Sequence, residues 1–299
     1  MKKKIRIGIP KTFFYYQYST LYRKFFSCLG CDIVISGPTT DEVIKLGQSF
    51  IRNSCLNGAI LFGHTFNLIN KCDYIFLPNY SNYGIRKNVC SSIKKVNSFL
   101  KSTFINMKFL TFDVDYLKGR CEFLAFLKIG IKLRRGIFRS IYAYVCAKRK
   151  ERMVNRNLIN GQNKLLVHNN NNKILIVGYP YVICDKYFVS DIVNCLKDND
   201  FEILYSTFID KKISSSYYLD VIPYLSNIYD KELLGSCSYL KNAVDGIIMI
   251  GTSNCNIYKA LEGANCSKLE IPMLRLVYPY NKSEIENFIN IVKAKITNK

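Results

Sequence analysis

The sequence lacks several features that would assign a function directly. No uncharged apolar run reaches roughly 18 residues, so we predict that no helix of the chain spans a membrane. There is no Gly-x-Gly-x-x-Gly, no P-loop and no other ATP-binding pattern, so we do not expect the chain to hydrolyse ATP by itself. Only two histidines are present, which leaves few candidates for proton transfer near neutral pH.

A secretory signal is also missing from the sequence. Residues 2–4 are lysines, but Arg6 and Lys11 interrupt the apolar run that should follow, and no small-residue cleavage site comes after it. We therefore expect a cytoplasmic protein. In reducing cytosol the 12 cysteines stay as thiols, which makes metal binding or redox chemistry an alternative to simple packing in the core.

Acidic residues are scarce relative to basic ones. The chain has 43 Lys and Arg against 22 Asp and Glu, a formal net charge of +21. Such a charge suits nucleic acid, an acidic partner or a phosphate-rich ligand such as coenzyme A. The lysines are scattered rather than confined to one stripe, so a general Lys, Asn, Ile and Tyr bias explains the charge better.

Short apolar segments alternate with helical patterns along the chain. The predicted strands are residues 5–10, 32–36, 74–77, 109–112, 174–180, 201–206, 246–250 and 273–276. Strands that alternate with helices indicate parallel sheets covered on both faces. We therefore predict an α/β fold with two Rossmann-like lobes. The predicted domains are an N-terminal lobe, a basic helical bridge with a linker, and a C-terminal lobe: residues 1–114, 115–168 and 169–299.

Landmarks in the two predicted lobes recur at one offset. Gly8 and Gly178 are 170 residues apart, as are the prolines at 10 and 180 and the serines at 36 and 206. A constant offset over a strand–helix–strand unit predicts an internal duplication. The alternative is that all such units look alike.

Three cysteines follow predicted strands or precede predicted helices. Ligands of an open parallel sheet gather outside the carboxyl ends of its strands, where Cys55, Cys90 and Cys255 are expected. A helix N-terminus favours a thiolate, the form that ligates iron–sulfur clusters. On spacing alone, buried packing cysteines are the better explanation. Seven others are expected to pack: Cys28, Cys31, Cys72, Cys146, Cys195, Cys237 and Cys266.

The order of several short motifs resembles a known family. Two groups of short segments carry the resemblance. The first is Ile7–Pro10, Ser36–Thr39, Ser54–Leu56, Phe62–His64 and Asp73–Pro78 with Cys90, and the second is Gly178–Tyr181, Asp185–Tyr187 and Val244–Ile248 with Cys255. Both groups are similar to motifs of the 2-hydroxyacyl-CoA dehydratase-related proteins. These include the acyl-CoA dehydratase activase-related and 2-hydroxyglutaryl-CoA dehydratase component D-like proteins. The resemblance covers nearly the whole chain. It departs from the family pattern after each cysteine, where Asn57, Ser91 and Asn256 replace the usual prolines or glycine.

The resemblance implies a cofactor and a partner. It makes Cys55, Cys90 and Cys255 the ligands of a [4Fe–4S] cluster between the lobes. It further implies low-potential one-electron reduction or dehydration, an acyl-CoA substrate and an ATP-dependent activator protein. Whether the chain is itself an enzyme stays open, because a catalytically silent scaffold or assembly subunit is the alternative. A dimer is also left open.

His64 is the candidate catalytic residue, as a proton donor near the cluster. The alternative is a structural hydrogen-bonding histidine. A nucleic-acid binder is the least favoured function. It would use the densest positive charge, which lies in residues 128–156: Lys132, Arg134, Arg135, Arg139, Lys148, Arg149, Lys150 and Arg152.

Overall fold

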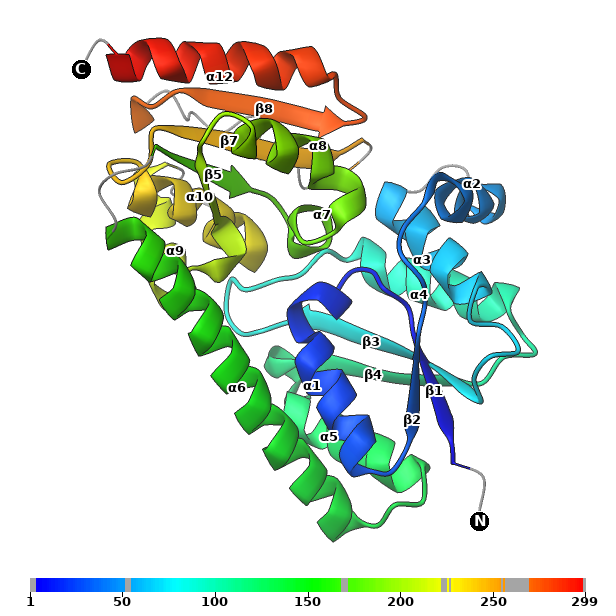
Figure 1. Cartoon of the computed structure of the whole chain (residues 1–299). Coiled ribbons are helices and arrows are strands. Elements are labelled where there is room, and N and C mark those ends of the chain that lie inside the picture. Colours follow the sequence, from blue (N-terminus) through cyan, green and yellow to red (C-terminus); the bar gives the residue numbers. More distant parts are fainter. Residues whose placement is uncertain are drawn as a thin grey trace. The chain divides into compact units, whose positions relative to one another are not determined.

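The computed structural model divides the chain into two compact units, Met1–Val154 and Asn155–Lys299. It describes residues 4–51, 55–167, 172–221, 225, 227–253, 255 and 269–297. Both units are α/β (Figure 1). No helix in these ranges is both long enough and apolar enough to cross a membrane.

Each unit contains one parallel sheet, and among the described residues each sheet has four strands. The first sheet has the order β2-β1-β3-β4 and the second has β6-β5-β7-β8. The strands are β1 (Arg6–Ile9), β2 (Asp32–Ile35), β3 (Tyr74–Asn82), β4 (Phe109–Asp115), β5 (Lys173–Val177), β6 (Glu202–Tyr205), β7 (Gly246–Thr252) and β8 (Met273–Tyr278).

Helices connect the strands in both units. In the first unit they are α1 (Tyr15–Cys28), α2 (Asp41–Phe50), α3 (Leu56–Phe66), α4 (Ser92–Thr103), η1 (Tyr116–Lys118) and α5 (Glu122–Lys132). Helix α6 (Ile137–Val167) crosses the boundary between the units. In the second unit they are α7 (Pro180–Ile183), α8 (Lys186–Lys197), η2 (Ser206–Phe208), α9 (Lys211–Tyr217), η3 (Tyr218–Asp220), α10 (Ile228–Leu240) and α12 (Lys282–Thr297).

The two sheets confirm the prediction of two Rossmann-like lobes, and both have the same strand order. The first two strands of each sheet lie side by side, and the third lies on the other side of the first. The strand order therefore reverses between β1 and β3, and again between β5 and β7. In open α/β sheets, ligands bind outside the carboxyl ends of the strands at such a switch point.

A carboxylate joins the first and third strands at the same place in both units. Asp73 Oδ2 accepts a hydrogen bond from the backbone N–H of Arg6 at 2.7 Å. Asp245 Oδ2 accepts the equivalent bond from Lys173 at 2.8 Å. Arg6 and Lys173 are therefore structural equivalents, 167 residues apart. The constant offset of 170 predicted from the sequence is wrong for the first strand, and Gly8 corresponds to Leu175.

The second strand does keep the offset of 170. Arg6 pairs with Asp32 and Lys173 pairs with Glu202. Just after these strands, the Ser36 hydroxyl accepts from the N–H of Lys11 at 2.8 Å, and the Ser206 hydroxyl accepts from the N–H of Gly178 at 3.4 Å. The serine match predicted from the sequence is therefore structural. Three extra residues between the first two strands of the second unit account for the two offsets.

Strand β3 is longer than its sequence pattern predicts. The expected strand ends at residue 77, whereas β3 reaches Asn82 because β4 continues beside it from Phe109 to Asp115. The neighbour on the other side, β1, ends at Ile9. The carboxyl end of β3 therefore extends beyond β1 and presents polar residues there.

Helices cover both faces of the first sheet. Ile75 and Leu77 belong to one apolar cluster with Leu61 of α3 and Val96 and Leu100 of α4. Alternate residues of a strand point to opposite faces. Phe76 accordingly contacts aromatic rings on the other face, Phe26 of α1 at 5.0 Å and Phe126 of α5 at 6.5 Å between ring centroids. The core therefore lies in two layers, one on each side of the sheet.

One residue of the basic segment 128–156 has a structural role. Lys148 Nζ lies 2.8 Å from Glu122 and 2.7 Å from Glu151, two buried carboxylates. Burial acts to lower the pKa of Lys148, but the charges of these carboxylates outweigh it and raise the pKa. This ammonium joins α5 to α6 and so contributes little to a polyanion-binding face. A role of residues 115–168 as a bridge between domains stays a prediction.

Helices α2 and α3 touch through their backbones. A Cβ atom added at Gly63 of α3 would lie 2.0 Å from the carbonyl oxygen of Val43, and one at Gly47 of α2 would lie 1.8 Å from that of Ala59. No side chain fits at either position without moving a helix. This contact fixes α3, and with it the residue that begins α3, Cys55.

We predict that Gly63→Ala and Gly161→Ala have opposite effects on stability. The Gly63→Ala change forces α2 and α3 apart and should lower the free energy of unfolding by about 1–3 kcal/mol or more. Gly161 lies in exposed α6 with no atom within 4 Å of an added Cβ, so Gly161→Ala should raise it by up to about 1 kcal/mol. Urea denaturation midpoints measure both. Equal shifts would contradict the close contact between the helices.

Candidate functional site

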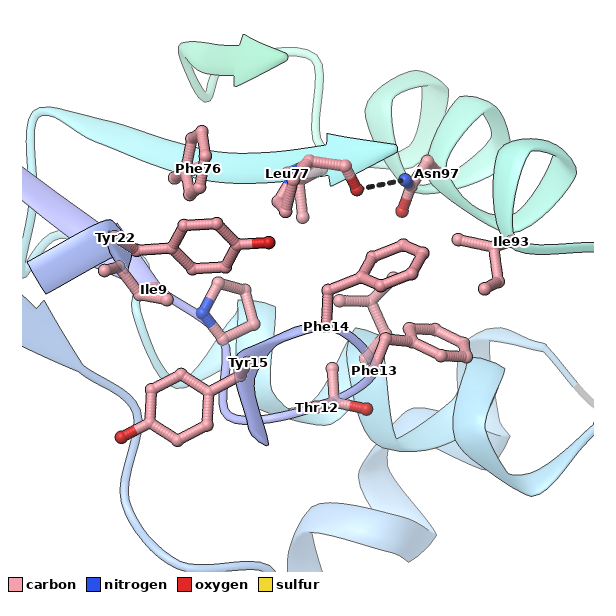
Figure 2. A pocket seen from close by; sticks show the side chains of 13 residues that line it. Ile9, Thr12, Phe13, Phe14, Tyr15, Tyr22, Phe76, Leu77, Ile93 and Asn97 are labelled. Atoms are coloured by element: carbon pink, nitrogen blue, oxygen red, sulfur yellow. Dashed lines mark hydrogen bonds between the residues drawn. The ribbon is translucent and has the colours of Figure 1, made fainter. Parts of the chain in front are cut away.

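A small pocket lies at the switch point of the first sheet (Figure 2). Ile9 and Pro10 at the end of β1 and Leu77 and Pro78 of β3 form one side of it. The rest comes from the turn before α1 and from Leu61, Ile93 and Asn97 of α3 and α4. The cavity volume is about 20 Å³, enough for one water molecule or one ligand oxygen.

Cys55 is the residue immediately before α3. It is the N-cap of that helix and is half-buried. Its carbonyl accepts from the N–H of Gly58 at 2.9 Å, the start of the helical hydrogen-bond pattern. Helix α3 leads into β3, so its first turn lies at the carboxyl edge of the first sheet. The segment after Cys55 forms a helix, α3, and a further helix, α2, lies between β2 and this position.

Cys90 lies at the same edge, just before α4. The N–H of the preceding residue, Val89, donates to the carbonyl of Ser81 near the end of β3 at 3.1 Å. The carbonyl of Cys90 accepts from the N–H of Ile93 in the first turn of α4 at 3.3 Å. The backbone at Cys90, whose side chain is half-buried, is therefore held between the end of β3 and the start of α4.

A polar network centred on Asp113 covers the ends of β3 and β4. Its carboxylate accepts hydrogen bonds from Ser81 at 2.6 Å and Asn79 at 2.5 Å, and pairs with Arg120 at 3.1 Å and Lys94 at 3.5 Å. Burial acts to raise the pKa of Asp113, but the hydrogen bond from Ser81 and the charge of Lys94 outweigh it and hold the pKa below its usual value. The strand ends beside Cys90 are therefore rigid and charged.

Cys255 belongs to the second unit, where it follows β7 and is 8% exposed. Asp230 of α10 accepts a short hydrogen bond from the hydroxyl of Tyr179, which follows β5. Burial, followed by the negative charge of Asp230, raises the pKa of Tyr179 well above its usual value, and the charge of a Cys255 thiolate adds to the rise. The three residues therefore gather at the switch point of the second sheet.

The kind of donor at the three predicted positions fits an iron–sulfur group. All are cysteines, and in the described part of the chain no cysteine forms a disulfide. Cys55 is the N-cap of α3, and Cys90 is the residue before the N-cap of α4. The same part contains no group of three His, Cys, Asp or Glu side chains close enough to hold a metal ion. The structure brings Cys55 and Cys90 to one sheet edge and Cys255 to the corresponding edge of the other unit.

Residues 6–209 match the family model described as CoA enzyme activase uncharacterised domain (DUF2229). The chain belongs to this DUF2229 family. The matched segment contains Cys55, Cys90 and His64 and ends before α9, so Cys255 lies outside it. Membership supports the predicted relation to acyl-CoA dehydratase activases at the level of the domain.

Other comparisons add no functional information about this DUF2229 chain. No curated protein matches it. The solved structures to which the chain shows weak similarity include ZnuA, at 10% identity over 99% of both chains with a TM-score of 0.30, and a mutant of the laminin-binding adhesin Lmb from Streptococcus agalactiae, at 12% over 97% of both with 0.28. A glucosamine-6-phosphate deaminase from Thermotoga maritima matches at 10% over 98% of this chain and 83% of the other, with 0.26. Such TM-scores support no argument.

His64 lies inside α3 and is fully buried. Its Nε2 is 3.2 Å from the hydroxyl of Thr39, which precedes α2. A buried ring that joins two helices fits the structural alternative. Proton donation by His64 stays a prediction.

Cys28 and Cys31 have the spacing Cys-x-x-Cys, which often marks metal or redox sites. They lie where α1 ends and β2 begins, so they are at the amino edge of the sheet. Burial raises the pKa of Cys31 although Arg135 acts to lower it, so this thiol resists becoming a thiolate. Packing remains the better interpretation for this pair, while Cys266 is outside the described residues.

Sequence reasoning missed three polar residues at the two switch points. Thr12 lines the first pocket, and Tyr179 and Asp230 pair in the second unit. Thr12 and Tyr179 lie in the turns that follow β1 and β5, within three residues of the strand end, a position that could have been singled out. Asp230 is the one acidic residue in the first turn of α10, yet its contact with a residue 51 positions away has no local signal.

We predict that Asp230 makes stability depend on pH. Burial raises the pKa of its carboxyl to about 7, although the hydrogen bond from Tyr179 acts to lower it. The unfolded chain therefore loses this proton near pH 4 and the folded chain near pH 7. The stabilisation is complete below pH 4 and is lost as the pH rises to 7, on the order of 4 kcal/mol.

The variant Asp230→Asn removes the titration and keeps an acceptor for Tyr179. Its stability relative to the native chain should increase from pH 4 to pH 7 and stay level above that. Urea unfolding at a series of pH values measures the difference. Parallel profiles would mean that Asp230 has the same pKa in the folded and unfolded chains, which would contradict the raised pKa.

Proposed function

We propose that this chain is an iron–sulfur protein of a CoA-enzyme activase system. In this proposal Cys55, Cys90 and Cys255 hold a [4Fe–4S] cluster used for low-potential one-electron reduction or dehydration, with an acyl-CoA as substrate. An ATP-dependent activator protein would supply the electrons. The proposal includes the finer resemblance to component D-like proteins of 2-hydroxyglutaryl-CoA dehydratase.

The common position of Cys55 and Cys90 carries the proposal. Each directly precedes or begins a helix, and the two helices lead into neighbouring parallel strands, β3 and β4. Both thiols therefore lie at one sheet edge, under the positive ends of α3 and α4. When bound, a [4Fe–4S] group supplies single electrons at a potential set by its ligands, hydrogen bonds and burial.

Residues around Cys90 are arranged to hold a ligand rather than to move. Asp113 is tied to Ser81 and Asn79 on β3, and Ser81 also accepts the backbone bond from Val89. A thiol on a fixed backbone loses less freedom when it binds a metal than one on a mobile loop. The same network brings Lys94 and Arg120 to this edge, where both pair with Asp113.

Anaerobic purification tests the proposal. We expect a brown protein with about four irons per chain. Cys55→Ser, Cys90→Ser and Cys255→Ser should each lose colour and most of the iron. Iron and acid-labile sulfide assays with electron paramagnetic resonance of the reduced protein provide the measurement.

Cys121 provides a matched control. It is also a half-buried N-cap cysteine, at the start of α5, but the resemblance assigns it no role. Cys121→Ser should therefore keep the iron and the colour. If colour and iron persist in all three ligand variants, the ligand assignment is wrong. Loss of iron in Cys121→Ser alone would place the cluster elsewhere in the first unit.

A scaffold or assembly subunit is the second candidate, and the position of Cys255 favours it. That residue lies outside the segment that matches the family model. An enzyme component should show its cluster reduced when an activator and ATP are added, and a scaffold should not. Optical bleaching under those conditions distinguishes the two, with ATP omitted as the control.

A further inference from the structure

The exposed face at the start of α6 carries larger apolar side chains than the face that is buried. Between residues 137 and 154 the buried residues are small or polar: Ser140, Ala143, Ala147 and Glu151. On the opposite face Phe138, Tyr142 and Val145 are 89%, 64% and 38% exposed. Residues three and four apart share one side of a helix, so these side chains form a single stripe. Packing of the first unit therefore does not explain them.

The same stripe continues as arginines. Arg149 and Arg152 follow Val145 at spacings of four and three residues, and both are exposed. At the start of the stripe, the turn between α5 and α6 adds exposed isoleucines and cations: Ile131, Lys132, Arg134, Ile137 and Arg139. We call these residues and the stripe together the hairpin surface.

The α5–α6 hairpin exposes no acidic side chain. Residues 122–167, all of which the structure describes, contain two carboxylates, Glu122 and Glu151. Both are buried, and both pair with Lys148, at 2.8 and 2.7 Å. The hairpin surface is thus positive and apolar at once, and its complement is a partner that is negative and apolar.

The hairpin surface lies at the amino edge of the first sheet. Arg139 Nε donates to the carbonyl of Cys28, where α1 ends, and Lys132 Nζ to that of Phe109, where β4 begins, both at 3.3 Å. Figure 1 shows the turn between α5 and α6 at the end of the unit where β1 and β2 begin. The two cysteines proposed as ligands in the first unit lie at the carboxyl edge, so a partner bound here leaves that edge open.

Other classes of partner fit this surface less well. A second copy of the chain would bring the same arginines together, and like charges repel. Nucleic acid would pair with the cations but gains little from aliphatic side chains such as Ile131 and Ile137. A protein would need a pocket matched to Phe138, whereas a bilayer takes apolar side chains of any shape. A basic helix with exposed aromatic and aliphatic side chains is typical of proteins that bind the surface of anionic membranes.

We propose that the hairpin surface binds an anionic lipid membrane, with Phe138 and the isoleucines of the turn in the interface and the arginines against lipid headgroups. Binding of this kind needs no membrane-spanning helix. The proposal goes beyond the iron–sulfur proposal and does not depend on it, because no residue of the hairpin surface belongs to the proposed cluster site.

Co-sedimentation of the purified full chain with lipid vesicles tests the proposal. One set of vesicles is phosphatidylcholine alone, and the other contains an equal amount of phosphatidylglycerol. We expect the chain to bind the mixed vesicles and not the neutral ones, with an affinity that falls as salt is added.

Two sets of substitutions at exposed positions separate the apolar from the charged contribution. Phe138→Ser should weaken binding to the mixed vesicles by at least about tenfold, because the phenyl group no longer leaves water. Arg149→Gln and Arg152→Gln together should weaken it by more than about tenfold, since each cation near an anionic surface contributes about fivefold. The Tm and the iron content should be unchanged in these variants, because none of these side chains is buried.

Ile85→Ser is the matched control. Ile85 is 81% exposed and precedes Arg86 and Lys87, but it lies in the loop after β3, at the carboxyl edge. This variant should bind the mixed vesicles as tightly as the native chain. Equal losses in Ile85→Ser and Phe138→Ser would contradict the proposal, as would no binding to the mixed vesicles at low salt. A chain that retards duplex DNA in a gel but does not bind vesicles would assign the surface to nucleic acid and overturn the proposal.

Discussion

A carboxylate hydrogen bond at the start of each sheet sets the geometry on which both candidate sites depend. Asp73 and Asp245 each accept the N–H of the first residue of the central strand, at 2.7 and 2.8 Å. The bond fixes the register between β1 and β3 in the first sheet and between β5 and β7 in the second. A slip of one residue would exchange the two faces of the strand. The turns after β1 and β5 therefore reach the switch points only in this register.

On this common frame the two units carry different chemistry. Equivalent turns end in Thr12 and Tyr179, and equivalent helices begin after Cys55 and Asn227. In the second unit Asn227 caps α10 by accepting a hydrogen bond from the N–H of Tyr229 at 2.9 Å. The first unit leaves a hydroxyl without an acceptor and has a thiol at the cap. The repeated strand order thus supports two sites with different tasks.

Local patterns predicted most of the fold. Strands such as β1, β2 and β6 were recognisable because short apolar runs end at Gly, Pro or Ser, and the positions of Ser36 and Ser206 were matched correctly. The end of β3 was not predictable, because residues 78–82 remain a strand through pairing with β4 and with the segment just before Cys90. The constant offset of 170 failed because the Gly and Pro residues that match in sequence at the first strand of each unit do not occupy equivalent positions in the two structures.

The candidate sites were less predictable than the fold. Cys55 and Cys90 could be placed at one sheet edge from the order of elements, because a helix that leads into a parallel strand must begin at the carboxyl edge. Whether the hydroxyl after the first strand has a partner depends on a helix distant in sequence, which is α3 for Thr12 and α10 for Tyr179. The residue of α3 that corresponds to Asp230 is Gly58, which has no side chain to accept a hydrogen bond. This difference is visible only after the hydrogen bond between Asp230 and Tyr179 is known. Contacts of this kind are fixed by packing and leave no periodic trace in the sequence.

Three local costs in the first unit occur at the same sheet edge. Cys55 stands where Asn, Asp, Ser or Thr would cap α3 better by about 1 kcal/mol. Thr12 buries a hydroxyl, and Phe13 has a left-handed backbone. The equivalents in the second unit carry none of these costs, since Asn227 caps its helix, Tyr179 is hydrogen-bonded, and proline at position 180 fixes a negative φ.

Folded proteins retain violations of local rules mainly where function requires them. One unpaired hydroxyl or one poor cap could be an accident of packing. Three such features on two neighbouring helix starts of one unit, each corrected in the other, are better explained by selection for binding at that edge. The first unit is therefore less stable at its switch point than it could be. Comparison with the equivalent residues of the second unit identifies these destabilising features.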